Sequence, residues 1–113
     1  MSRANGKKRK KPTESTVYIP CLVQPGMFKG EWLVQLAASD PHDPDKTVEV
    51  KLFADERDVR GIQGTPERHK PAKAWLRVTL VKKAGGMAEV VFPQPAQPVG
   101  NSAFFEEKLL EAV

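Results

Sequence analysis

Apolar and polar residues alternate along several short stretches of this chain, which is the pattern of a half-buried β-strand and not of a helix. In the clearest stretch, residues 74–82, every second side chain from Ala74 to Leu80 is apolar, whereas Trp75 and Arg77 fall on the opposite face. Glycine, proline or polar residues bound each stretch. The pattern therefore predicts strands over residues 16–24, 31–38, 47–54, 74–82 and 87–92.

Glycine and proline also indicate how these strands are connected. Gly85 and Gly86 predict a tight hairpin, because paired glycines readily adopt the positive φ that such turns need. Residues 55–58 are expected to form a turn or a single helical turn. The three prolines between residues 93 and 98 predict an extended segment outside the ladder, since proline has no N–H to donate.

The C-terminal stretch, residues 101–113, shows a different period. Phe105, Leu109 and Ala112 recur at spacings of four and three residues, which predicts a short amphipathic helix. A second interpretation stays open, in which Phe104 and Phe105 form a brief sixth strand ahead of a shorter helix.

These elements predict an all-β (mainly β) fold: a small antiparallel barrel or rolled sheet of five or six strands, with a short C-terminal helix. Closure of the sheet covers strand edges that would otherwise favour aggregation. SH3-like and OB-like topologies both fit this pattern. A chain of 113 residues has room for one core. We therefore expect a basic N-terminal tail over residues 1–15 and a single barrel domain over residues 16–113.

Most of the excess positive charge lies near the N-terminus. Six basic residues and no acidic residue precede Thr13, whereas the rest of the chain holds 12 basic and 14 acidic residues. The tail has no large apolar side chain after Met1, so it is expected to be disordered. A polybasic run can neutralise the phosphates of nucleic acid or bind another polyanion; alternatively, it is a solubilising end with no ligand. The predicted polyanion-binding residues are Lys7, Lys8, Arg9, Lys10 and Lys11.

The only cysteine, Cys21, lies in an apolar strand and is expected to be a buried, unreactive thiol. A single cysteine forms no disulfide within the chain, which favours a reducing compartment. No apolar run approaches the roughly 20 residues of a membrane helix, and no apolar segment follows the basic start as it would in a signal peptide. We therefore expect a cytoplasmic protein with no membrane span.

Few residues of the chain suit catalysis or metal binding. Both histidines, His42 and His69, lie in polar loops that contain proline, and no serine stands in a nucleophile elbow. The acidic stretch 40–45 lacks the glycine and the distal glutamate of a calcium loop, and no cysteine–histidine spacing suits zinc. We expect no enzyme activity, no metal and no cofactor.

Trp75 and Arg77 are the candidate surface-recognition residues of the domain. An exposed tryptophan beside an arginine can stack on a nucleobase or pack against a peptide. The competing interpretation, which we favour from the sequence, is that the C-terminal helix covers Trp75.

The predicted function is a small, non-catalytic interaction module whose basic arm contacts nucleic acid or another polyanion. The alternative is a protein–protein interaction or scaffold domain with no nucleic-acid partner, which would use the proline segment or a sheet edge.

Overall fold

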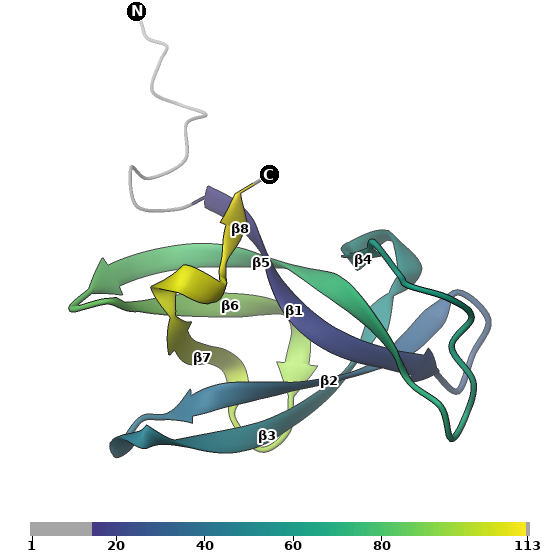
Figure 1. Ribbon diagram of the computed structural model, residues 1–113, viewed down its shortest axis with the longest axis horizontal. Helices are drawn as coiled ribbons and strands as arrows, with labels where there is room; N and C mark the ends of the chain where they lie inside the picture. The colour runs from purple at the N-terminus through teal and green to yellow at the C-terminus, as the bar shows by residue number, and fades with distance from the viewer. Residues whose placement is uncertain (1–14, 113) are drawn as a thin grey trace, which may run out of the picture.

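The computed structural model describes residues 15–112, and most of them lie in β-strands (Figure 1), so the predicted all-β class is confirmed. Two single 3₁₀ turns, η1 (Glu56–Asp58) and η2 (Glu107–Leu109), interrupt the strands. Within the described residues, no helical segment has the length and apolar character that crossing a membrane requires. The strands are β1 (Ser15–Pro25), β2 (Glu31–Asp40), β3 (Asp43–Asp55), β4 (Val59–Arg60), β5 (Ala72–Ala84), β6 (Met87–Ala96), β7 (Gly100–Glu106) and β8 (Glu111–Ala112).

Five of these strands form a closed antiparallel ring. Hydrogen-bonded neighbours follow the order β2-β7-β6-β5-β1, and β1 pairs back onto β2 to complete the ring. β3 extends the sheet outward from β2, β8 adds to β1, and β4 pairs with β5. In Figure 1, β2 and β3 cross below β5 and β6, with β1 running diagonally between the two layers. The predicted small barrel is thus confirmed.

The apolar half of each alternating strand fills the barrel. Every second residue of β1 and β5 is buried along most of their length, and Ile19 and Leu76 are among the largest fully buried side chains. Because side chains of a strand alternate between its two faces, the remaining residues of β5, including Trp75 and Arg77, lie on the outer face. Small inward residues let so narrow a barrel close. They include Ala38, Ala54, Ala74, Ala88 and Ala103.

The tight connections follow from local sequence. Gly85 and Gly86 join β5 to β6 with φ values of 60° and 80°, as the glycine pair predicts. Residues 56–58 form the expected single helical turn, η1. The connection between β2 and β3 is shorter than the polar sequence suggests, because the strands run to Asp40 and resume at Asp43. The backbone N–H of His42 donates to Asp40 Oδ1 at 2.8 Å, which stabilises this turn.

The predicted C-terminal helix is wrong. Residues 100–106 pair with β6 as strand β7, and only residues 107–109 turn helically, as the 3₁₀ turn η2. Phe105 is 2% exposed and packs edge-on against Phe92, with 6.3 Å between ring centroids. The stabilisation gained by burying this ring in the barrel exceeds the weak preference for a helix that the spacing of the apolar residues indicates. The second interpretation, a brief strand at Phe104 and Phe105, agrees with the structure.

The proline-rich segment is not the separate connector that the sequence suggests. β6 continues to Ala96, although its register with β7 is broken between Val91 and Ala96. Two of the prolines therefore lie where the ladder is irregular and needs no N–H from them. Gln97 then exchanges two backbone hydrogen bonds with Lys51 of β3, of 2.9 and 2.8 Å. This contact ties the end of β6 to the outer strand.

Candidate functional site

The outer face of β1, β5 and β4 brings two aromatic and two arginine side chains together. Cross-strand register places Tyr18 opposite Arg77, and places Trp75 between Pro20 on β1 and Arg60 on β4. We call Tyr18, Arg60, Trp75 and Arg77 the aromatic–arginine strip. Sequence analysis singled out Trp75 and Arg77, and the structure adds Tyr18 and Arg60 to them.

Arg60 stacks on Tyr18 within this strip. The guanidinium carbon, Cζ, lies 3.6 Å from the centroid of the phenol ring, which is the distance of a cation–π contact. The Tyr18 ring contacts one face of this planar, permanently charged group, and Arg60 is otherwise exposed. A guanidinium held in this way can stack a second planar group, such as a nucleobase, on its other face.

Arg77 is anchored differently, by an ion pair with Asp58 of η1. Arg77 Nε donates to Asp58 Oδ1 at 3.1 Å, and Nη2 donates to the same oxygen. Asp58 is 6% exposed and is the one buried charged residue within the described part of the chain. A carboxylate buried to this degree requires its partner, since an uncompensated buried charge is strongly destabilising. Arg77 therefore holds η1 against β5, and Arg60 is the arginine of the strip better placed to meet a ligand.

Trp75 is partly buried, but not under the predicted C-terminal helix, which does not form. Leu109, expected to lie over the indole, is 37% exposed. The chain just after β4 covers the tryptophan instead: a Cβ added to Gly61 would lie 3.0 Å from Trp75 Cδ1. Gly61 also has a φ of +67°, which other residues rarely adopt. A glycine is thus needed at this close approach.

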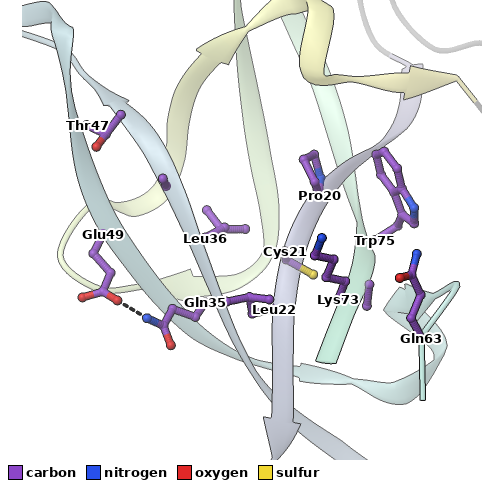
Figure 2. Close-up of a pocket in the computed structure, with 12 residues that line it drawn as sticks. Pro20, Cys21, Leu22, Gln35, Leu36, Thr47, Glu49, Gln63, Lys73 and Trp75 are labelled. Atoms are coloured by element: carbon purple, nitrogen blue, oxygen red, sulfur yellow. Dashed lines mark hydrogen bonds between the residues drawn. The ribbon is translucent and has the colours of Figure 1, made fainter. Parts of the chain in front are cut away.

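A groove of about 600 Å³ lies beside the strip, where β1 and β2 diverge. Within the described residues, β1 and β2 pair only along the four residues from Leu22 to Pro25. Figure 2 shows β1, with Pro20 and Cys21, running between β2 on one side and β5 on the other. We call this hollow the seam groove. Its lining residues are Pro20, Cys21, Leu22, Gln35, Leu36, Ala37, Thr47, Glu49, Gln63, Lys73, Ala74 and Trp75.

The seam groove combines an apolar floor with polar walls. Pro20, Leu22 and Leu36 supply apolar surface along its base. On the β2 side, the Gln35 amide donates from Nε2 to Glu49 Oε2, drawn as a dashed line in Figure 2. On the β5 side, Lys73 and Trp75 lie near Gln63, whose backbone N–H donates to the Lys73 carbonyl at 2.9 Å. Polar groups therefore face each other across an apolar base, as in many ligand sites.

Cys21 contributes to the groove but offers no nucleophile. The side chain is buried, as predicted, and burial raises the pKa of the thiol to about 12. The thiolate is the reactive form of cysteine, so a thiol with this pKa is almost wholly protonated near neutral pH. Cys21 is a packing residue.

The histidines and the acidic stretch do not assemble into a site. His42 lies in the β2–β3 turn and His69 in the long connection from β4 to β5; these connections lie at opposite sides of the molecule in Figure 1. Asp40 and Asp43 each accept a hydrogen bond from the backbone N–H two residues later. Within residues 15–112, no three histidine, cysteine or acidic side chains group in a way that would hold a metal ion.

Sequence analysis missed one further surface feature, the loop between β1 and β2. Met27 and Phe28 are 74% and 72% exposed at its tip. Their backbone N–H groups both donate to Glu31 Oε1, at 3.0 and 3.3 Å, and the Glu31 N–H donates to the Phe28 carbonyl at 3.2 Å. The loop is therefore fixed in a shape that displays two large apolar side chains.

The polybasic run lies outside the described residues. Lys11 is four positions before Ser15, where β1 begins. Of the other missed residues, Tyr18 could have been found from sequence, because it alternates with inward-facing Val17 and Ile19. Arg60 carries no comparable signal, since it lies in a strand of two residues within a long connection.

Comparison of the chain with protein-family models gives no match, and comparisons with curated proteins and with solved structures give none either.

Proposed function

We propose that this protein is a non-catalytic module that binds nucleic acid. The observation that carries the proposal is the aromatic–arginine strip, above all the stacked Arg60 and Tyr18 on the outer face of a rigid barrel. Arginine and aromatic planes on a sheet surface are the groups that stack unpaired bases and meet phosphates. An intracellular setting is part of this proposal.

The distribution of charge in the domain supports the proposal. Residues 57–77, which include β4 and most of the strip, hold six basic and two acidic residues. The other residues from 15 to 112 hold six basic and eleven acidic residues. A polyanion is thus attracted to the segment that carries Arg60, Trp75 and Arg77, in a domain that is acidic elsewhere.

The polybasic run adds to this attraction. Lys7 to Lys11 end four positions before β1 begins, and β1 carries Tyr18 only seven positions after Lys11. The run is therefore tethered at the strand that contributes one end of the strip. Basic residues of this kind supply sequence-independent affinity by releasing counterions from the phosphates, while the strip supplies contacts to bases.

Substitution of Arg60 tests the proposal. We expect Arg60→Ala to weaken binding of a single-stranded oligonucleotide of about 12 residues roughly 10-fold, through loss of stacking and of a charge. Arg60→Lys keeps the charge but not the plane, and should recover only part of the affinity. Fluorescence anisotropy with a labelled oligonucleotide at low salt measures both effects.

Lys82→Ala is the matched control, since Lys82 is an exposed basic residue of β5 beyond the strip. This control should change the affinity less than about 2-fold, as expected for one distant, solvated charge. Equal losses in Arg60→Ala and Lys82→Ala would show that only net charge matters and would contradict the proposed role of the strip.

The loop that displays Met27 and Phe28 favours a second candidate function, a protein–protein interaction module. Exposed large apolar side chains on a fixed loop lose little entropy on binding, and such residues act as anchors in protein interfaces. This function needs neither the strip nor the polybasic run. We rank it second because three of the four strip residues belong to the basic segment 57–77, whereas no other feature of the described residues supports the loop as a binding site.

A further inference from the structure

The seam groove lies next to the aromatic–arginine strip, and Trp75 belongs to both. Trp75 pairs in register with Arg60 on β4 and with Pro20 on β1, and Pro20 lines the groove. Lys73, two residues before Trp75 on the same face of β5, also lines it. A strand of nucleic acid lying along the strip therefore passes the mouth of the groove, with a lysine there to meet a phosphate.

We infer that the seam groove binds an unpaired nucleobase, an inference that rests on the proposed function. A base is a flat apolar ring system with hydrogen-bonding groups around its edge. The groove has the complementary arrangement: an apolar floor at Pro20, Leu22 and Leu36, and amides of Gln35 and Gln63 on opposite walls. Each amide carries two donors and an acceptor, so the bond from Gln35 to Glu49 leaves capacity for a ligand.

An added peptide strand fits the groove less well. Strand addition needs a regular row of donors and acceptors along an open edge. Pro20 lies on β1 where β2 has diverged from it, and proline occurs in sheets where its missing N–H faces away from the ladder. The Lys73 carbonyl accepts from Gln63 on the edge of β5 that faces away from β1, and Trp75, two residues later, has the same backbone orientation. Pro20 lies opposite Trp75 in this pair, so its missing donor falls on the edge of β1 that faces the groove. A peptide bound at this edge would therefore form an incomplete set of backbone hydrogen bonds with β1.

Occupation of the groove by a base makes binding depend on unpaired bases rather than on phosphates alone. The test compares an oligothymidine of about 12 residues with an abasic oligonucleotide of the same length and charge, both bound to the full chain. We expect the oligothymidine to bind about 10-fold more tightly, because stacking of even one or two bases is lost with the abasic strand.

Two groove variants and one control test whether the preference for oligothymidine over the abasic strand arises in the seam groove. Ala37→Leu fills the groove from an exposed position on β2, and should weaken oligothymidine binding about 5-fold while leaving the abasic strand unchanged. Ala84→Leu is the matched control, because Ala84 is exposed on β5 and does not line the groove. Gln63→Ala changes a loop side chain outside the sheet and provides a second groove variant, with the same expected selectivity.

The outcomes separate the two claims. Selective loss of oligothymidine binding in Ala37→Leu or Gln63→Ala, but not in Ala84→Leu, supports the groove as a base site. Equal affinity of the unaltered chain for the two oligonucleotides overturns the base site and also the base contacts proposed for the strip, and leaves binding to phosphates alone. If the unaltered chain prefers the oligothymidine but both groove variants bind like the control, the base site is overturned and the proposed function stands. If the unaltered chain binds neither oligonucleotide at low salt, the proposed function itself is wrong.

Discussion

We expect deletion of residues 1–12 to lower the affinity for a single-stranded oligonucleotide at least about 100-fold at roughly 50 mM salt. The deletion removes all six basic residues of the N-terminal segment and no acidic one. Each phosphate contact on a single strand contributes about 0.7 to the slope of log affinity against log salt concentration. The slope should therefore fall by up to about 4, and anisotropy titrations at several salt concentrations measure both quantities.

The same assay can separate the effect of the segment's charge on affinity from the effect of its length. Replacing Lys7 to Lys11 by glutamine keeps the length of the segment and should reproduce most of the loss. Replacing the four lysines of this run by arginine keeps the charge and should retain the affinity. Unchanged affinity and an unchanged salt slope in the deletion would show that the polybasic run takes no part in binding.

The second large effect is expected at alkaline pH and comes from Cys21. The thiol has a pKa of about 12 in the folded protein and a reference value of 9.0. Below pH 9 the thiol is protonated in both states, so its contribution to stability is complete there. Between pH 9 and 12 the unfolded state releases the proton first, and the free energy of unfolding falls by about 1.4 kcal/mol per pH unit.

Urea unfolding of the unaltered chain and of Cys21→Ala measures this contribution. From pH 9 to pH 11 the unaltered chain should lose about 3 kcal/mol more stability than Cys21→Ala, after normalising each to its own value at pH 7. All other ionisable groups are common to both proteins, so the comparison isolates the contribution of Cys21. Parallel pH profiles would mean that the thiol is not desolvated in the folded state.

The strands were predictable because burial imposes a period of two on their side chains. β1 and β5 each alternate over most of their length, and the inward residues predicted for β5, every second residue from Ala74 to Leu80, are buried. The glycine pair at residues 85–86 was equally informative, because its local conformation alone specifies a hairpin. By contrast, Phe105 and Leu109 fit both a helix and a strand in so short a segment. Only the closure of the barrel, which buries Phe105, decides between the two.

Most of the candidate site depends on tertiary structure that local sequence does not reveal. Trp75 and Arg77 follow from the alternation in β5, but the partner of Arg77 is Asp58, 19 positions away in a different element. Arg60 reaches Tyr18 only because β4 and β1 pair with the same stretch of β5 from its two edges. The seam groove arises from the divergence of β1 and β2, which is a property of the closed ring. No single stretch of residues encodes it.

We propose that nucleic acid binds across the outer face of β1, β4 and β5, and chemical-shift mapping of the isotope-labelled full chain, titrated with an oligothymidine at low salt, is the decisive experiment. We expect the largest shifts at the backbone amides of Tyr18 and Arg60 and at the indole N–H of Trp75. Shifts confined to the loop at Met27 and Phe28, or no shift in residues 15–112 at saturating oligonucleotide, would contradict it.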